Sequence, residues 1–372
     1  MHKKKKEHKK RGIGWTILRI FLGAAGILVL VLVVYIGYLF ASYHRIEDNL
    51  ELEVEKPAEG NVDETLKTGT EYSALTYNIG FGAYTPDFSF FMDGGKSSWA
   101  KSKESVLETV SGAGKLAASY DPDFALIQEV DLNSTRSYHV NEYELLKESF
   151  PEYDSVFAQN YDSAFLFYPF TQPHGRSRSG LALFSRYPVT SALRRSFPVS
   201  TSFTKFFDLD RCYSISRIPV ENGKELVIFE LHMSAYGNSD AIREGQISML
   251  CNDMEAEYGA GNYVLCGGDF NHDLKASEDD STGHESWAYP FPREDLPEHF
   301  TFCLDLLSEE EKDELWDSAR NADMEYVPGV TYTVTLDGFI ISDNLECLSY
   351  ENINSGYSYS DHDPVYLKFK LK

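Results

Sequence analysis

The feature that most constrains this chain is a run without charged side chains from residue 20 to residue 42, whose centre, Ile27–Val34, is wholly aliphatic. A helix needs roughly 20 apolar residues to cross the hydrocarbon core of a bilayer. Trp15, Tyr35 and Tyr38 lie toward the ends of the run, where aromatic rings anchor at the membrane interface. The run therefore predicts a transmembrane helix over 20–42.

A cleaved signal peptide is the main alternative to a membrane anchor. Its apolar core is only about 7–15 residues long and ends at small residues suited to cleavage. Here the run is longer, and the bulky Phe40 stands where a small residue is needed. We therefore expect an uncleaved signal anchor, with a basic cytoplasmic tail over 1–19, because lysines directly before a span stay cytoplasmic and send the C-terminus outward. The lysines are either a solvated tail or a site for anionic lipid.

The net charge of −24 combines two opposite parts. Residues 1–45 contain nine basic and one acidic side chain, a net of +8, so the remaining 25 basic and 57 acidic residues give −32 over 46–372. Such an acidic outer part argues against a broad basic surface for nucleic acid. Residues 43–71 are acidic and poor in core-forming side chains, which predicts a flexible linker before a domain over 72–372.

That domain alternates short apolar strands with helices. The expected strands lie near residues 73–78, 124–127, 180–184, 226–231, 263–266, 339–341 and 364–369, and helices are expected near 99–119 and 240–257. Because the strands are closely spaced and helices are few, a mixed, partly antiparallel sheet system covered by helices is expected.

Polar side chains suited to metal or phosphate chemistry stand at the ends of these strands. They are Asn78, Glu129, His232, Asp269, Asn271, Asp337, Asp361 and His362. One Asp or Asn beside a strand is usually a turn former. Eight such groups at strand ends instead predict one site on a rigid scaffold.

The chemistry of these side chains is consistent with a hard divalent cation. Carboxylates and phosphate oxygens are the ligands that Mg²⁺ prefers, and histidines titrate near neutrality and serve as general acids or bases. No cysteine belongs to the set and the histidines lack zinc spacing, which argues against a structural zinc site. Absence of Gly-x-Ser-x-Gly and Walker patterns excludes the serine-hydrolase and nucleoside-triphosphatase classes.

Six motifs then occur in a characteristic order. They are Thr76–Ile79, Pro122–Val130, Gly180–Arg186, Gly268–Asn271, Leu336–Ser342 and Ser360–Pro364. Together they resemble the signature of the endonuclease/exonuclease/phosphatase superfamily, and the similarity covers about residues 72–372. The Gly-Asp-Phe-Asn sequence followed by Ser-Asp-His is the most specific part.

The resemblance implies a four-layered α/β/β/α sandwich of two mixed sheets and metal-dependent cleavage of a P–O bond. By this analogy Glu129 is the main ligand of Mg²⁺ (or Mn²⁺ or Ca²⁺), helped by Asn78 and Asp361. The remaining roles it implies are catalytic. His362 is oriented by Asp337, His232 contacts the phosphate or leaving group, and Asp269 and Asn271 position nucleophile and substrate. The identity of the general base stays open.

The substrate is less constrained than the reaction. Arg176 and Arg178, just before the strand near 180–184, are candidate phosphate-binding residues, although a solvated loop is the simpler explanation. Aromatic stretches at 81–99 and 287–292 either hold part of a substrate or form local core.

We expect an outward-facing, membrane-anchored phosphoesterase acting on a small phosphodiester, a phosphomonoester or a phospholipid headgroup. A nuclease of the same fold and a non-catalytic binding domain are the alternatives; oligomeric state is left open.

Overall fold

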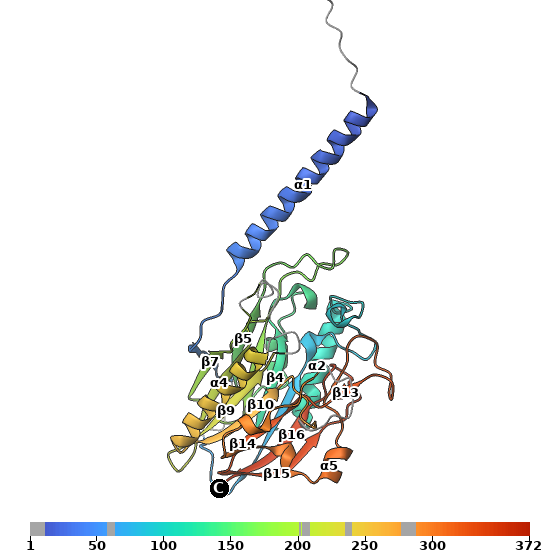
Figure 1. Cartoon of the computed structure of the whole chain (residues 1–372). Helices are drawn as coiled ribbons and strands as arrows, with labels where there is room; N and C mark the ends of the chain where they lie inside the picture. Colours follow the sequence, from blue (N-terminus) through green and yellow to red (C-terminus); the bar gives the residue numbers. More distant parts are fainter. Residues whose placement is uncertain (1–11, 58–63, 201, 203–208, 235–239, 277–287) are drawn as a thin grey trace, which may run out of the picture. The chain divides into compact units, whose positions relative to one another are not determined.

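The chain divides into two units, residues 1–44 and residues 45–372. The computed structural model describes residues 12–57, 64–200, 202, 209–234, 240–276 and 288–372. Figure 1 shows the elements of both units along the chain.

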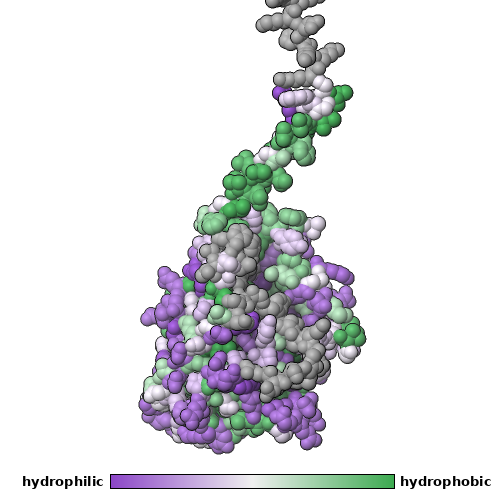
Figure 2. Space-filling model, in the orientation of Figure 1, coloured by the Kyte–Doolittle hydropathy of each residue, from purple (hydrophilic) through white to green (hydrophobic). Residues whose placement is uncertain are grey.

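The first unit contains one apolar helix, α1 (Ile13–Ser42), of 30 residues. At 1.5 Å per residue it is about 45 Å long, more than the roughly 30 Å of a hydrocarbon core. Its side chains are hydrophobic along most of its length, whereas the visible face of the second unit is largely hydrophilic (Figure 2). The helix begins before the predicted span and ends where the prediction ends. It is long and apolar enough to cross a membrane, a property that membrane anchors share with signal sequences.

The second unit is built on two seven-stranded sheets. The first has the order β1 (Leu50–Leu52), β7 (Ser191–Ser196), β8 (Cys212–Pro219), β9 (Glu225–His232), β10 (Tyr263–Asp269), β14 (Asp337–Ser342), β11 (Phe300–Phe302). The second has the order β15 (Leu345–Asn352), β16 (Val365–Leu371), β3 (Glu71–Asn78), β4 (Phe124–Asp131), β6 (Arg178–Ser185), β5 (Asp154–Asp162), β2 (Val54–Glu55). A short ribbon pairs β12 (Ala319–Arg320) with β13 (Thr333–Val334). Both large sheets are mixed, because β3–β4 and β9–β10 are parallel and the other pairs are antiparallel.

The side chains of the central strands alternate between two apolar layers. On β4, Phe124 and Leu126 pack into the core between the sheets, whereas Ala125 and Ile127 pack into a second core on the other face. Because successive side chains of a strand point to opposite faces, a strand buried on both sides is apolar throughout. The uninterrupted apolar run from Phe124 to Ile127 has this origin.

Helices cover the outer faces. The outer core of the second sheet includes side chains of α2 (Lys103–Ser119) and α3 (Glu142–Lys147), and that of the first sheet includes side chains of α4 (Asp240–Gly259). A short helix, α5 (Glu309–Glu314), follows β11. The predicted α/β/β/α sandwich of two mixed sheets is confirmed.

Local sequence signals explain where α2 begins and ends. Ser102 caps its first turn, since the Ser102 hydroxyl accepts a hydrogen bond of 3.1 Å from the Ser105 amide. Pro122 stands three residues after the last helical residue and disfavours continuation of the helix.

The structure differs from the predicted linker over 43–71. Leu50–Leu52 pairs with β7, and Val54–Glu55 pairs with β5, so these residues are edge strands of the two sheets. Leu66 is fully buried and bridges to Val220. The acidic composition misled the prediction because an edge strand needs only one covered side and tolerates charged residues on the other.

Candidate active site

The predicted site residues converge at one edge of the two sheets. Parallel pairing places Asp269 of β10 opposite His232 of β9, and antiparallel pairing places Asp269 opposite Asp337 of β14. In the second sheet, Asn78 at the end of β3 lies opposite Gln128, next to Glu129 in β4. Strand ends from both sheets thus meet across the sandwich.

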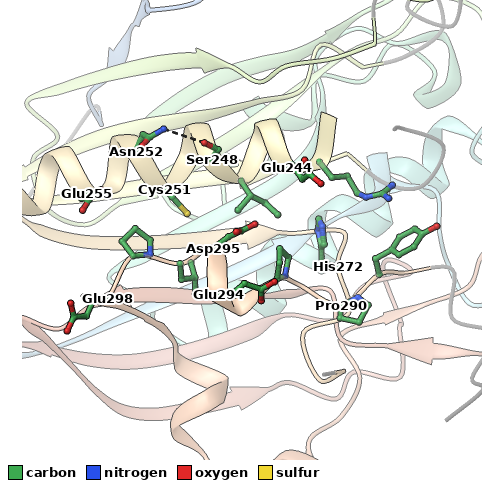
Figure 3. A pocket seen from close by; sticks show the side chains of 16 residues that line it. Glu244, Ser248, Cys251, Asn252, Glu255, His272, Pro290, Glu294, Asp295 and Glu298 are labelled. Carbon is green, nitrogen blue, oxygen red and sulfur yellow. Dashed lines mark hydrogen bonds between the residues drawn. The ribbon is translucent and has the colours of Figure 1, made fainter. Parts of the chain in front are cut away.

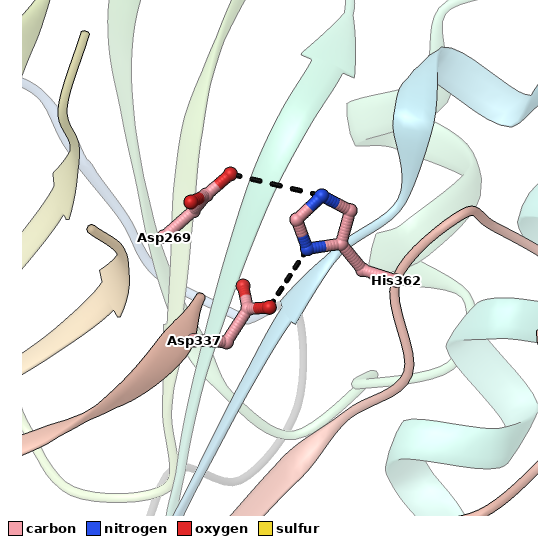
Figure 4. Close-up of side chains that lie close together, drawn as sticks. All are labelled: Asp269, Asp337 and His362. Atoms are coloured by element: carbon pink, nitrogen blue, oxygen red, sulfur yellow. Dashed lines mark hydrogen bonds and ion pairs between the residues drawn. The ribbon is translucent and has the colours of Figure 1, made fainter. Parts of the chain in front are cut away.

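His362 lies between two carboxylates (Figure 4). Its Nδ1 atom is 2.7 Å from Asp337 Oδ2, and its Nε2 atom is 3.8 Å from Asp269 Oδ2. Burial alone would lower the pKa of His362, but the charges of Asp337 and Asp269 raise it well above its usual value. The Ser318 hydroxyl, 2.7 Å from Asp337 Oδ2, holds that carboxylate in place.

These three side chains offer ligand atoms that all lie within 4.8 Å of one another. The short contact from His362 Nδ1 to Asp337 is a hydrogen bond, so its proton occupies the position that a metal ion would need. The geometry therefore fits an imidazole oriented by a carboxylate better than a metal-ligand set.

Asn78 connects the two halves of the site. Its Nδ2 atom donates to Asp269 Oδ2 at 3.0 Å and lies 3.5 Å from Glu129 Oε1. Its Oδ1 atom accepts from the Gly80 amide at 3.0 Å, which fixes the orientation of the side-chain amide.

Glu129 and Asp361 are the site's carboxylates with the fewest hydrogen bonds. Burial raises the pKa of Glu129, and the charge of Asp361 raises it further. Burial likewise raises the pKa of Asp361. Glu129 occupies the left-handed backbone region, with φ of 59°, at an irregularity where β4 departs from its register with β6. Backbone strain of this kind persists at functional sites, where it orients a side chain toward the site.

His232 and Asn271 flank Asp269. His232 Nε2 is 3.4 Å from Asp269 Oδ2, and burial lowers the pKa of His232 well below its usual value, which favours the neutral imidazole. The Asn271 amide donates to Asp269 Oδ1 at 2.8 Å, and its Nδ2 donates to the Met233 carbonyl at 3.0 Å. Gly268 is required beside them, since a Cβ there would lie 2.1 Å from the Leu231 carbonyl oxygen.

All but two of the eight predicted residues line one cavity of about 510 Å³. The lining members are Glu129, His232, Asp269, Asn271, Asp361 and His362. Asn78 and Asp337 do not line the cavity but form hydrogen bonds with lining residues, Asn78 with Asp269 and Asp337 with His362. Their predicted catalytic and metal-binding roles stay predictions.

A wider groove, of about 830 Å³, lies between α4 and residues 288–298 (Figure 3). Its lining is rich in carboxylates, among them Glu244, Glu255 and Glu294, and contains none of the predicted site residues. The smaller cavity is therefore the candidate site.

Arg176 and Arg178, expected to bind substrate, do not belong to the cavity lining in the described part of the chain. Arg176 pairs with Asp162 at 2.8 Å, and Arg178 donates to Gln159 Oε1 at 3.2 Å. Their side chains are instead part of the surface around β5 and β6.

Three other arginines line the cavity, namely Arg136, Arg211 and Arg320. Arg136 is bound by both oxygens of Asp131, and Arg320 donates to backbone carbonyls. Arg211 is different, because within the described structure its buried Nε and Nη1 atoms have no hydrogen-bond partner. Its charge acts on both Glu129 and His232. No sequence motif marks Arg211, so its place is visible only in the fold.

The cavity also has an aromatic side. Phe81, Tyr84 and Phe90 line it and lie almost entirely buried. The stretch 81–99 therefore supplies both local core and a cavity wall. Trp287, predicted in the second aromatic stretch, lies outside the described residues.

Comparisons with known proteins identify the family and the fold. The family model for the endonuclease/exonuclease/phosphatase family matches residues 75–301. No curated protein matches the sequence significantly.

Solved structures share the fold at low sequence identity. An endonuclease/exonuclease/phosphatase from Beutenbergia cavernae DSM 12333 has 14% identity and a TM-score of 0.54, covering 81% of this chain and 72% of that chain. One from Bacteroides vulgatus has 15% identity and a TM-score of 0.52, covering 82% and 100%. D. rerio TDP2, solved with a single-strand DNA product, has 14% identity and a TM-score of 0.53, covering 81% and 100%. With more than half of its residues matched by the family model, the chain belongs to the endonuclease/exonuclease/phosphatase family.

Proposed function

We propose that this protein hydrolyses phosphate esters with the help of a divalent metal ion. The observation that carries the proposal is the convergence of Glu129, Asp361 and the Asp337–His362 pair on one cavity. Members of the family are typically metal-dependent phosphoester hydrolases or nucleases.

The residues present fit a hard cation. Glu129 and Asp361 are partly buried carboxylates with few hydrogen bonds, since Asn78 approaches Glu129 at 3.5 Å and Ser360 donates to Asp361 at 3.2 Å. Two such carboxylates with an amide nearby suit Mg²⁺ or Mn²⁺ better than a soft metal. Glu129, Asp361 and Asn78 would hold the ion, which when bound offsets negative charge developing on the phosphoryl oxygens.

The remaining side chains supply proton transfer and positioning. Asp269 lies beside both imidazoles, and its amide contacts from Asn78 and Asn271 fix its carboxylate. Burial raises the pKa of Asp269, which suits a group that accepts a proton from an attacking water. Asp337 keeps His362 charged, so that His362 binds a phosphoryl oxygen. Arg211 supplies a second cationic donor for the same phosphate.

The direct test is hydrolysis of a panel of phosphate esters by the full chain in detergent micelles, with Mg²⁺ or with excess EDTA. We expect activity to disappear with EDTA and to fall by at least about 10²-fold in Glu129→Gln, because the main metal ligand is weakened. Glu346→Gln is the matched control, since Glu346 pairs with Lys370 on the sheet surface. Activity that survives both EDTA and Glu129→Gln would overturn the proposal.

A nuclease is the second candidate. The aromatic rings that line the cavity support it, because bases stack on aromatic side chains. The net charge of −32 over 46–372 opposes it, because extended nucleic-acid binding relies on many phosphate contacts. Cleavage of a 20-nucleotide single strand at low salt, at a rate matching that of small esters, would favour the nuclease.

We further propose that α1 is retained as an anchor and that the second unit lies outside the membrane. The lysine-rich segment before the span supports this orientation. A C-terminal tag on intact cells should be removed by added protease. Protection of the tag would place the second unit in the cytoplasm and contradict the orientation.

A further inference from the structure

An aromatic loop joins β5 to β6 and exposes apolar rings. In the loop over 163–177, Phe167 is 49% exposed, Tyr168 63% and Phe170 84%. Large apolar side chains are costly to leave in water, and clustered ones mark an interaction surface.

Hydrogen bonds hold this loop in its conformation. The Ser98 hydroxyl donates to the Gln172 carbonyl at 2.7 Å, and Trp99 Nε1 donates to the Pro173 carbonyl at 2.7 Å. The His174 amide closes the tip by donating to the Tyr168 carbonyl at 3.2 Å. The rings are thus displayed by a fastened loop.

A continuous series of aromatic contacts leads from the tip to the cavity. Ring centroids are 5.9 Å apart for Phe170 and Tyr168, 5.8 Å for Tyr168 and Phe91, and 5.0 Å for Phe91 and Phe90. Phe90 and the 62%-exposed Met92 line the cavity itself. A row of packed aromatic rings therefore connects the exposed loop with the candidate active site.

The charge of the loop sets it apart from the acidic unit around it. Residues 163–177 include no Asp or Glu but do include His174 and Arg176, although residues 46–372 together have a net charge of −32. An acidic surface is repelled by anionic lipids, whereas an aromatic segment without acidic groups partitions into the bilayer interface.

The chain enters the second unit beside the same cavity. Arg45 pairs with Asp210, and the Ile46 amide donates to Asp210 Oδ2 at 2.6 Å. Leu209 and Arg211, the neighbours of Asp210, line the cavity.

From these observations we propose that the loop over 163–177 docks on the surface of a phospholipid bilayer and that it presents membrane phospholipid esters to the cavity at the end of this row of rings. The docking stands on the loop itself, whereas the substrate class rests on the proposed phosphoesterase function. The occupant is the bilayer, because the loop combines exposed rings with an absence of acidic groups in a chain that also has an apolar helix long enough to cross a membrane.

Docking is tested without reference to catalysis. Full-length Phe170→Trp protein in phosphatidylcholine vesicles should show extra tryptophan emission that is blue-shifted and quenched by lipids brominated near the headgroup, after subtraction of the wild-type signal. The control is Leu306→Trp, since Leu306 is 55% exposed and does not line the cavity. Unquenched emission of Phe170→Trp overturns the docking, and a blue shift without lipid quenching indicates a protein partner and also overturns it.

The substrate class is tested by a double variant, Tyr168→Ser with Phe170→Ser. Hydrolysis of phospholipid in vesicles should fall about tenfold, while hydrolysis of a water-soluble phosphodiester stays within about twofold, since interfacial binding scales with the buried apolar area. Leu306→Ser should change neither rate. Equal loss on both substrates would overturn the docking role. If the wild type hydrolyses neither ester, the proposed function fails while the quenching result stands.

Discussion

At the scale of single residues, Arg211 is the side chain whose role is most open to measurement. Two buried nitrogens of its guanidinium have no hydrogen-bond partner in the described structure, and Arg211 lines the cavity together with Glu129 and His232. We expect Arg211→Ala to lower kcat/KM for an anionic ester by about 10- to 100-fold, because a charge-assisted hydrogen bond is worth about 1.5–3 kcal/mol. Arg211→Lys should restore part of the loss.

Arg176→Ala provides the control for this measurement. Arg176 pairs with Asp162 on the surface and lies away from the cavity lining. We expect an unchanged kcat/KM. A larger effect in Arg176→Ala than in Arg211→Ala would contradict our assignment and restore the sequence-based one.

His174 offers a pH-dependent test of how the cavity wall is packed. Burial and the charge of Arg136 lower the pKa of His174 to about 4, from an ordinary value of 6.5. The folded state therefore binds fewer protons than the unfolded state between these values, so stability is full above pH 6.5 and is lost as the pH falls toward 4.

The size of the effect follows from the shift. Between pH 7 and pH 5, the wild type should lose about 2 kcal/mol of unfolding free energy that His174→Gln keeps. Urea unfolding at both pH values checks this. His139→Gln, at an exposed position, is the control and should respond to pH as the wild type does. An identical pH response of His174→Gln and the wild type would show that His174 protonates freely in the fold.

The sequence could predict those site residues that lie at the ends of strands. Asn78, Glu129, His232 and Asp269 follow apolar runs directly, and neighbouring strands bring such positions to one edge. Arg211 could not be found in this way, because nothing in its local sequence distinguishes it from Arg176. We single out Arg211 because two of its buried nitrogens have no hydrogen-bond partner in the described structure, and only the folded chain shows this.

At the scale of elements, the first strands of the second unit depend on a buried arginine. Arg194 of β7 is completely buried and donates to the carbonyls of Gln159 at 2.7 Å, Glu47 at 3.0 Å and Asp210 at 2.9 Å. It thereby joins the segment before β1, β5 and the segment before β8. The sequence could not predict β1 and β2, because their partners lie more than 90 residues away and their own residues are acidic.

Replacing this arginine should release the N-terminal segment. We expect Arg194→Met to lower the unfolding free energy by about 2–4 kcal/mol, since several buried carbonyls lose a charged donor. Hydrogen exchange should accelerate in residues 45–55. Arg217→Met, which removes the more exposed pairing with Glu225 and Glu257, is the control and should leave exchange in 45–55 unchanged. Slow exchange there in Arg194→Met would show that β1 and β2 hold without it.

At the scale of the whole molecule, overall and local charge differ in sign. Residues 46–372 have a net charge of −32, whereas three arginines line the cavity. The distant acidic charges repel an anionic substrate, whereas the arginines attract it only at short range. Salt screens the long-range repulsion more than the short-range attraction, because the Debye length is about 30 Å at 0.01 M and about 10 Å at 0.1 M. Long-range repulsion is therefore removed first.

We expect kcat/KM for a soluble dianionic ester to rise about twofold or more as NaCl increases from about 10 to 150 mM, because screening removes the repulsion that slows encounter. A zwitterionic phosphocholine ester has no net charge and should show little change, which separates steering from a general effect of salt on the protein. A steady fall of the dianion's kcat/KM over this range would instead reveal a basic approach to the cavity. That outcome would favour the nuclease, since its substrate is bound through many phosphate contacts whose strength declines with salt.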